Sequence, residues 1–307
     1  MALTLDQINS ITEKKFMKKL VDNVFDSSPL LQILKDKSYD KLDGGDQIVC
    51  PLNYAQTTAA GFYTGADTLS TSDNENITGA AYTWKQAYAG ISITSLDEKK
   101  NSGDAAQVSL LKSKMMIAEK TLADILGTAL YNTGATANQL VGLRAIVASS
   151  NTIGGISQST NTWWAAGVDD SSTTTFSISA LQTAYNTLTI NNETPDLILA
   201  TRANYNRYYA SLQPQQRFTD SGTAKAGFSN LMFNGSKFIS DSKCPANHIF
   251  VIDTNYLHLW VHKDEDFKFS PFQKPLNQNV KVAQIFWMGA FGADNIRKLG
   301  KFSAVAA

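Results

Sequence analysis

The sequence has few cysteines and no long apolar run. Its two cysteines, Cys50 and Cys244, lie in apolar, strand-like contexts, which favours buried free thiols in a reducing compartment over a disulfide. No stretch approaches the roughly 18 apolar residues that a membrane-spanning helix needs. The N-terminal residues also lack the continuous apolar core of a signal peptide. We therefore expect the protein to be cytosolic where it is made, without a membrane partner.

An excess of either charge is also missing. Lysine plus arginine and aspartate plus glutamate balance at 27 each over 307 residues, so no global field draws the chain to nucleic acid or to an anionic membrane. With 43% hydrophobic residues, the chain can bury a sizeable core as one large domain or two ordinary ones. Any contact with DNA would have to come from local patches and would be weak.

Signatures of catalysis are absent from the sequence. No phosphate-binding loop, dinucleotide fingerprint or nucleophile elbow occurs. Asp264, Glu265 and Asp266 could bind a cation, but no further oxygen ligands follow at calcium-loop spacing, so a solvated turn is the better interpretation. A serine hydrolase would need an acid beside a histidine, and Asp253 near His258 is the only local candidate. The sequence therefore predicts no catalytic residue, no cofactor and no enzyme activity.

The three histidines all fall between His248 and His262. His258 and His262 have the four-residue spacing of a helical zinc pair. The segment from Tyr256 to His262 alternates as a strand, however, and on a strand four residues separate two imidazoles by about 13 Å, too far to share a metal. We therefore expect no metal site, and interpret these histidines as polar-face residues that flank Trp260.

Residues 42–84, named here the acidic stretch, lack lysine and arginine entirely. They contain five acids: Asp43, Asp46, Asp67, Asp73 and Glu75. From Ala55 to Thr83 the only large apolar residues are Phe62, Tyr63, Leu69, Ile77 and Tyr82. That is too little to close a core, yet the alternation from Ala81 to Ile93 indicates strand rather than disorder. The acidic stretch therefore predicts an extended arm that completes its folding against neighbouring subunits.

Residues Gly103 to Tyr131 predict one long amphipathic helix, capped by Ser102. Its apolar stripe repeats with spacings of three and four, and consists of Val108, Leu111, Met115, Ala118, Leu122, Ile125 and Ala129. The stripe could form a coiled coil, but its small residues favour burial on a sheet. At about 1.5 Å per residue the helix would span roughly 40 Å.

The remaining pattern is α+β, without an internal repeat or a Pro-rich linker. Helices are expected at residues 5–24, from Ser28-Pro29 to Leu34, within Thr173–Ile190 and at Arg202–Leu212. Strands are expected at Gln47–Tyr54, Leu197–Thr201, Ile249–Thr254, Tyr256–His262 and Val280–Phe291, the last of them apolar on both faces. A polar loop is expected at Gln213–Ala226 and a hairpin turn at Phe233-Asn-Gly-Ser.

Several short motifs follow one another along nearly the whole chain. They are Phe25-Asp-Ser-Ser-Pro-Leu, Gly44-Gly45, Leu140-Val-Gly-Leu-Arg-Ala-Ile-Val, Gly154-Gly155-Ile156 with Trp163-Trp164, Asp241 to Pro245, Asn255-Tyr256-Leu257, Phe267-Lys-Phe-Ser-Pro-Phe with Pro275, and Val282-Ala-Gln-Ile-Phe-Trp-Met-Gly. Each motif alone is weak. In this shared order, the sequence resembles the major capsid proteins of tailed bacteriophages.

The resemblance implies the Hong Kong 97-type fold. This α+β fold has an N-terminal arm, an extended loop, a long spine helix in a peripheral domain, and an axial domain with a central sheet flanked by helices. In this chain it implies an arm at 1–45, an extended loop at 46–95, a peripheral domain with the spine helix at 96–139, an axial domain at 140–262, and a return to the peripheral domain at 263–307.

The resemblance also implies a function. Family members assemble into hexamers and pentamers that form an icosahedral head shell around double-stranded DNA, so we expect a virion protein that is assembled in the host cytoplasm. Many members begin with a scaffolding segment that is later cleaved. Here the first predicted helix begins within a few residues of Met1, so we expect either a mature form or a separate scaffold protein. Portal and decoration proteins are further candidate partners.

Within this interpretation, the acids of the extended loop dock onto basic groups of an adjacent subunit. The residues assigned to this assembly interface are Asp67, Asp73 and Glu75 on the loop, and Lys14, Lys18, Arg297 and Lys298 as receivers, with Lys15, Lys19 and Lys301 nearby. Exposed ion pairs contribute about 0–1 kcal/mol each, so charge would set register while apolar burial and strand pairing stabilise the shell. An encapsulin-type compartment, which encloses enzyme cargo, stays open as an alternative of the same fold. A tail or decoration protein is disfavoured by the long helix.

Overall fold

The chain divides into two units, each described here by itself. The computed structural model describes residues 28–72, 74–100, 110–171, 174–212, 231–303 and 305–306. Of these residues, 88–100, 110–122 and 269–286 belong to the first unit, and the rest belong to the second. The helix expected at 5–24 and the loop expected at 213–226 lie outside the described residues. The five-part division given above stays a prediction.

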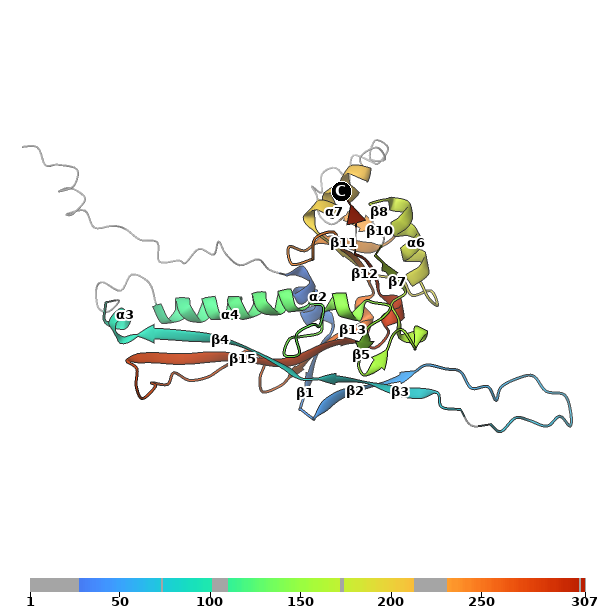
Figure 1. Cartoon of the computed structure of the whole chain (residues 1–307), viewed down its shortest axis with the longest axis horizontal. Coiled ribbons are helices and arrows are strands. Elements are labelled where there is room, and N and C mark those ends of the chain that lie inside the picture. The colour runs from blue at the N-terminus through green and yellow to red at the C-terminus, as the bar shows by residue number, and fades with distance from the viewer. Residues whose placement is uncertain are drawn as a thin grey trace, which may run out of the picture. The chain divides into compact units, whose positions relative to one another are not determined.

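A long helix beside two long strands characterises the first unit. Its elements, some of which continue into the second unit, are β4 (Lys85–Thr94), α3 (Ser95–Lys100), α4 (Leu110–Ala129), β14 (Lys268–Phe269) and β15 (Val280–Ala293). Strand β4 pairs with β15, and α4 runs along these strands in Figure 1. The Lys114 ammonium donates to the Ser92 carbonyl at 2.6 Å, which fastens the helix to β4. The long helix therefore packs on strands of its own chain, as its sequence favours.

Among the described side chains of the expected stripe, one, Ile125, is exposed. Ala118, Leu122 and Ala129 are buried, but Ile125 is 46% exposed and Leu126 is buried instead. A helical turn takes 3.6 residues, so Leu126, four residues after Leu122, lies closer to the face of Leu122 than Ile125, three residues after it. Ile125 was therefore assigned wrongly. The helix also ends at Ala129 rather than Tyr131, and the expected residues 103–109 lie outside the described ranges.

Strand β15 is buried on both faces only at its end. Ala283, Ile285 and Trp287 alternate with partly exposed residues, and full burial of both faces begins at Gly289 and continues to Ala293. The expectation of a strand buried on both faces holds only for residues 289–293. β15 pairs with β13 (Leu257–His262), and the strand order of the five-stranded sheet is β1-β13-β15-β14, with β4 also on β15.

The N-terminal part of the second unit begins with a capped helix. Ser28 accepts a hydrogen bond from the Leu31 N–H, and Pro29 takes the first position of α2 (Pro29–Lys37), as the sequence predicts. β1 (Tyr39–Leu42) follows, and pairs in parallel with β13. β1 was not predicted from the sequence. Its four residues bury neither face completely, so they show no apolar pattern. Gly44 and Gly45 then turn the chain with φ of 121° and 114°, which favours glycine.

A two-stranded ribbon follows this turn. β2 (Gln47–Asn53) and β3 (Ile77–Thr83) pair antiparallel over their full length, and are named here the β2–β3 ribbon. The strand expected from Ala81 to Ile93 is interrupted at Trp84. Its indole N–H donates to the Gly45 carbonyl at 2.9 Å, so Trp84 closes the ribbon against the glycine turn instead of continuing the ladder.

A six-stranded sheet with two helices forms the core of the second unit. Its strand order is β10-β11-β9-β12-β16-β7. These strands are β7 (Val168–Asp170), β9 (Leu197–Ala200), β10 (Leu231–Phe233), β11 (Ser236–Ser240), β12 (Ile249–Ile252) and β16 (Gly300–Phe302). Every residue of β9 and β12 is buried, as expected for strands covered on both faces.

Helices α6 (Ile178–Leu188) and α7 (Arg202–Leu212) pack on this sheet through aromatic residues. Tyr208 stacks on Phe238 with ring centroids 4.5 Å apart and meets Phe233 edge-on. Burial of a side chain of this size stabilises the fold by about 1.5–3 kcal/mol. Both helices, both central strands and the hairpin turn at Asn234-Gly235, with φ of 46° and 90°, follow the sequence prediction.

Short elements complete the described chain. They are α5 (Leu143–Ile146), β5 (Thr152–Ile153), β6 (Ile156–Ser157), η2 (Thr162–Trp164), β8 (Thr174–Thr175), η5 (Thr254–Tyr256), η6 (Ile296–Lys298) and β17 (Val305–Ala306). Cys50 and Cys244 are free thiols, as expected, but only Cys244 is buried and Cys50 is partly exposed. No helix within the described ranges is both long enough and apolar enough to cross a membrane.

Candidate assembly surfaces

The ribbon carries a long loop, residues 54–76, named here the β2–β3 loop. The Tyr54 N–H donates to the Asn76 carbonyl at 3.0 Å and closes its base. Across its width, the Asn74 amide donates to the Thr58 hydroxyl at 2.5 Å. In Figure 1 the loop runs out from the ribbon and returns to it. Small polar residues dominate its sequence, so the loop has few apolar side chains that could pack against its own subunit.

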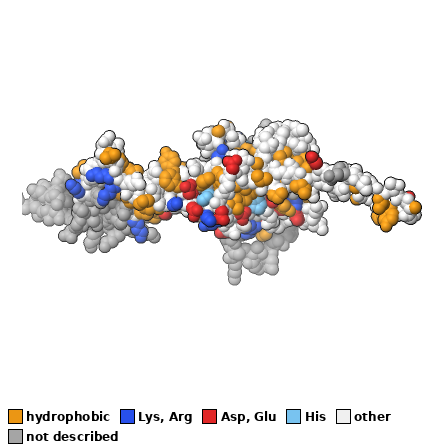
Figure 2. All heavy atoms as spheres, turned by 90° about the horizontal axis from the view of Figure 1, so that it is seen from below, with side chains coloured by type: hydrophobic (Ala, Val, Ile, Leu, Met, Phe, Trp, Pro, Cys, Tyr) orange, Lys and Arg blue, Asp and Glu red, His pale blue; other side chains and the backbone are white. Residues whose placement is uncertain are grey.

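Large apolar side chains of this loop face solvent. Phe62 is fully exposed, Tyr63 is 65% exposed and Leu69 is 59% exposed. Figure 2 shows hydrophobic side chains gathered at the free end of the loop, with mostly uncharged polar surface along the rest of it. A cluster of exposed aromatic and aliphatic groups on a projecting loop is typical of an interaction site, because leaving it in water is unfavourable.

The acids assigned to the loop are placed as follows. Asp67 is exposed, and its carboxylate accepts the Thr64 N–H at 2.9 Å within a turn of the loop. Glu75 is exposed beside the ribbon, and Asp73 lies outside the described residues. Within the described part of the chain, no lysine or arginine forms an ion pair with Asp67 or Glu75.

The proposed basic receivers separate into three groups. Lys14 and Lys18, with Lys15 and Lys19, lie outside the described residues. Arg297 is exposed on η6, whereas its neighbour Lys298 is only 5% exposed. Lys301 is also engaged, since its ammonium donates to the Arg144 carbonyl and lies 3.3 Å from the Asp169 carboxylate.

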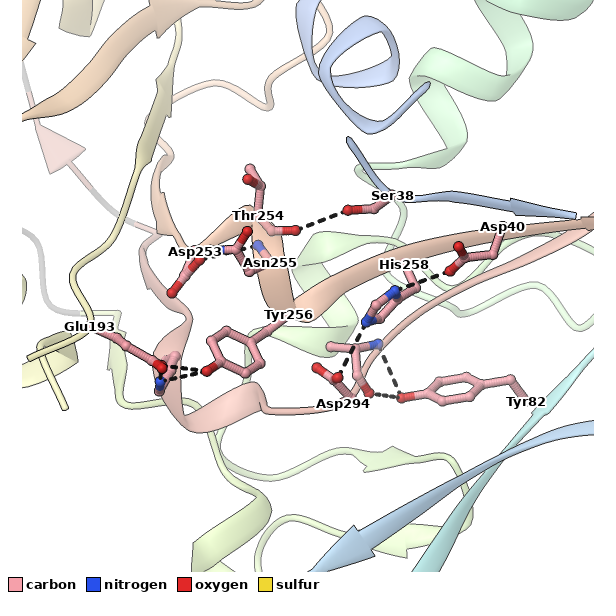
Figure 3. Close-up of polar contacts among 12 residues, drawn as sticks. Ser38, Asp40, Tyr82, Glu193, Asp253, Thr254, Asn255, Tyr256, His258 and Asp294 are labelled. Atoms are coloured by element: carbon pink, nitrogen blue, oxygen red, sulfur yellow. Dashed lines mark hydrogen bonds and ion pairs between the residues drawn. The ribbon is translucent and has the colours of Figure 1, made fainter. Parts of the chain in front are cut away.

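Lys298 has partners within its own chain. Its ammonium donates to the Tyr256 hydroxyl at 2.8 Å, forms an ion pair with Glu193 and lies 4.2 Å from the centroid of the Tyr256 ring. Burial lowers the pKa of this ammonium. Figure 3 shows Glu193 and Tyr256 meeting at this point. Arg297 therefore remains the accessible member of the pair, and Lys298 contributes to the fold of its own subunit.

A cleft of about 480 Å³ opens at the base of the ribbon, beside Arg297. Tyr54 and Trp163 form one wall, with stacked rings whose centroids are 5.2 Å apart. Asn191, Glu193 and Asn295 are polar residues that also line the cleft. An aromatic wall beside an exposed guanidinium suits a peptide segment that carries both aromatic and acidic side chains.

The histidines of β13 have separate partners. His258 Nδ1 lies 3.3 Å from Asp40 Oδ2, and its Nε2 lies 3.3 Å from Asp294 Oδ2. His262 Nδ1 instead accepts the Asp264 N–H at 3.2 Å. The strand geometry is as predicted, and no group of three or more histidine, cysteine or acidic side chains with metal-binding spacing exists among the described residues.

Asp253, considered for catalysis, and Asp266, considered for cation binding, both have structural contacts. Asp253 caps η5 by accepting the Asn255 N–H at 3.1 Å, and is not a partner of His258. Asp266 accepts from the Tyr39 hydroxyl and pairs with Lys41 at 2.9 Å, which ties the turn after β13 to β1. The true partners of His258, Asp40 and Asp294, could not be found from sequence, because they are distant in the chain and no motif marks them.

Comparisons with known proteins identify the fold. No family profile and no curated protein sequence matches this chain. Among solved structures, the capsid of cyanophage A-1(L) matches with a TM-score of 0.73 at 17% identity, over 99% of this chain and 100% of that one. The capsid of a native GTA particle matches with a TM-score of 0.70 at 10% identity, over 97% and 96%. The SrpI encapsulin of Synechococcus elongatus PCC 7942 matches with a TM-score of 0.64 at 9% identity, over 99% and 96%.

These matches cover almost the whole of each chain. The protein therefore has the Hong Kong 97-type fold shared by phage capsid proteins, and the predicted fold class is confirmed.

Proposed function

We propose that this protein is a major capsid subunit that assembles into hexamers and pentamers of an icosahedral head shell around double-stranded DNA. The observation that carries the proposal is the β2–β3 loop, whose Phe62, Tyr63 and Leu69 are exposed on an otherwise polar segment. A second copy of the chain would cover these side chains. The fold, shared over the full chain with phage capsids, supports the same proposal. The role is structural, with no enzymatic activity.

The loop acids set the register of this contact in the proposal. Asp67, Asp73 and Glu75 would approach cations of the adjacent subunit, with Lys14, Lys18 and Arg297 as receivers. Lys298 is set aside, because Glu193 and Tyr256 already hold its ammonium. The first unit offers a further basic surface, since its described residues include seven lysines and three acids. Opposite net charge favours association of the loop with that surface.

The wider setting follows from the same proposal. The protein would be a virion component assembled in the host cytoplasm, with scaffold, portal and decoration proteins as further partners. Residues 1–45 would form the arm, 46–95 the extended loop, 96–139 and 263–307 the peripheral domain, and 140–262 the axial domain. A net charge of zero suits the inner surface of a shell, because that surface should not bind the densely packed DNA strongly.

An encapsulin-type compartment is the second candidate, and the match to the SrpI encapsulin favours it. That match has a lower TM-score than the cyanophage capsid, 0.64 against 0.73. The two functions differ in contents. Particles purified from the native source would contain double-stranded DNA in the first case and an enzyme in the second.

Electron microscopy of the recombinant full chain tests the proposal. We expect closed shells or capsomer-sized rings, and a stable monomer at high concentration would contradict assembly. The variant Phe62→Ser/Tyr63→Ser/Leu69→Ser should fold with unchanged circular dichroism yet fail to form shells. The matched control Phe62→Leu/Tyr63→Phe/Leu69→Ile keeps apolar groups at the same positions and should assemble. Equal yields from both variants would remove the loop from the interface.

A further inference from the structure

His258 bridges two carboxylates that belong to different segments. Asp40 on β1 and Asp294 just after β15 each lie 3.3 Å from one ring nitrogen, and Figure 3 shows the imidazole between them. A neutral imidazole carries one N–H, so it can donate to only one of the two acids. The imidazolium carries two and can donate to both. The complete bridge therefore requires a protonated ring.

The same corner holds the β2–β3 ribbon through Tyr82 of β3. The Tyr82 hydroxyl donates to the Ala293 carbonyl at 2.5 Å and accepts the Ala293 N–H at 3.2 Å, one residue before Asp294. A second route runs through ring stacking. His258 stacks on Trp260 with centroids 5.5 Å apart, and Trp260 meets Tyr82 at 5.0 Å. Changes at His258 therefore reach β3 through both a hydrogen-bonded backbone and packed rings.

Solvent can reach this bridge. A cleft of about 510 Å³ is lined by β2 residues, by the turn after β1 and by His258, Trp260 and Asp294. The His258 side chain is 24% exposed. The other oxygen of Asp294, Oδ1, is buried without a hydrogen-bond partner among the described residues. A neutral ring donates to only one of the two carboxylates, so either Asp40 or Asp294 would lose its donor.

Two other titratable groups that line the cleft, Asp43 and Cys50, have pKa values shifted away from neutral pH. The ion pair with Lys263 holds the pKa of the Asp43 carboxyl below its usual range. Burial raises the pKa of the Cys50 thiol to about 11. Asp40 from β1 and Asp294 from the corner also line the cleft, one on each side of the His258 ring.

We propose that His258 is a pH-sensitive clamp that fastens the base of the β2–β3 ribbon when protonated and loosens it when neutral. The consequence of this clamp rests on the proposed function. In an assembled shell, an anchored ribbon would present the β2–β3 loop to the neighbouring subunit in one orientation. The hydrogen bond to Asp294, more than any other contact, raises the pKa of His258, which brings the switch toward neutral pH. Acid then favours the anchored ribbon and alkali the loosened one.

Hydrogen–deuterium exchange of the unassembled full chain tests the clamp. Protection factors, corrected for the intrinsic effect of pH, are measured for peptides covering residues 77–83 and 287–294 between about pH 5 and pH 9. In the wild type we expect a several-fold loss of protection as pH rises. In His258→Gln the protection should be low and independent of pH. His262→Gln is the matched control on the same strand, and should keep the wild-type response.

A second variant keeps the test decisive if His258→Gln misfolds. Asp40→Asn removes one anion from a half-exposed position, and should move the midpoint of the exchange profile to lower pH. A pH response that persists in His258→Gln, or that disappears in His262→Gln, overturns the proposal. Assembly is scored separately by electron microscopy. A protein that forms no shells but shows the exchange profile would refute the capsid function and leave the clamp in place.

Discussion

The Tyr131 hydroxyl donates a hydrogen bond of 2.9 Å to Asp241, a carboxylate that is only 1% exposed. The same oxygen accepts from the Ser28 hydroxyl at 2.9 Å, and the other oxygen accepts the Lys243 N–H at 2.9 Å. Burial, and then the Asp241 charge, raises the pKa of Tyr131 well above its ordinary value. One buried carboxylate thus joins the start of α2, the end of α4 and the turn after β11.

Removal of this carboxylate should destabilise the second unit strongly. We expect Asp241→Ala to lower the free energy of unfolding by about 2–4 kcal/mol, because two hydroxyls and two backbone N–H groups lose their acceptor inside the protein. Tyr131→Phe should cost about 1 kcal/mol, since it removes one donor and leaves the others. Urea denaturation followed by circular dichroism measures both, with the exposed Tyr88→Phe as control. Equal stability of Asp241→Ala and the wild type would contradict the assigned network.

Gly142, within the motif Leu140-Val-Gly-Leu-Arg-Ala-Ile-Val, is required for packing. A Cβ at this position would lie 2.2 Å from the Asn132 nitrogen and 2.7 Å from the Ala129 carbonyl oxygen, both backbone atoms that cannot move aside. We expect Gly142→Ala to cost about 3 kcal/mol or more. Gly90→Ala is the matched control, because nothing lies within 4 Å of its Cβ. Thermal denaturation of the two variants compares them, and similar melting temperatures would refute the close approach.

The sequence predicted the elements whose signals are local. The Ser28-Pro29 cap, the helix Arg202–Leu212 and the hairpin at Asn234-Gly235 each depend on neighbouring residues, and each is present as expected. β1 was missed because its four residues are defined by pairing with β13, which is distant in sequence. A strand of that length has no periodicity of its own to detect.

The candidate site was only partly predictable for the same reason. The β2–β3 loop could be predicted as an extended segment from its acids and its few apolar residues, because composition is a local property of the sequence. Arg297 and Lys298 looked equivalent in sequence. The η6 turn places one in solvent and the other against Tyr256 and Glu193, which lie distant in the chain. The two partners of His258 likewise come together only in the folded chain.

Neutralising the loop acids should weaken the register of assembly without unfolding the subunit. In Asp67→Asn/Asp73→Asn/Glu75→Gln we expect a lower assembly yield at low salt, because the attraction to the basic groups is lost. The yield should also depend less on salt concentration, because that attraction is the interaction that salt screens. The monomer should keep its melting temperature. Asp36→Asn/Asp264→Asn, with exposed acids of the second unit outside the loop, serves as the control. Light scattering across a salt series measures assembly, and an unchanged yield and salt sensitivity would disprove docking through these acids.

Stability should depend on pH with opposite signs at two histidines. The pKa of His258 is raised, mainly by its hydrogen bond to Asp294, so its contribution is fully present below the unfolded pKa of 6.5 and is lost as pH rises through the higher folded value. The pKa of His248 is lowered, mainly by burial beside Phe250, so protonation there favours the unfolded chain and stability falls as pH drops below 6.5.

Urea denaturation of His258→Gln and His248→Gln over a pH series above about pH 5 separates the two contributions. The wild type should exceed His258→Gln in the free energy of unfolding most at the acid end of the series, and the difference should shrink toward alkaline pH. Relative to the wild type, His248→Gln should gain stability only at the acid end, because it removes the group that prefers protonation in the unfolded chain. The same sign of pH dependence in both variants would rule out the proposed environment of His258, since burial alone would then govern each ring.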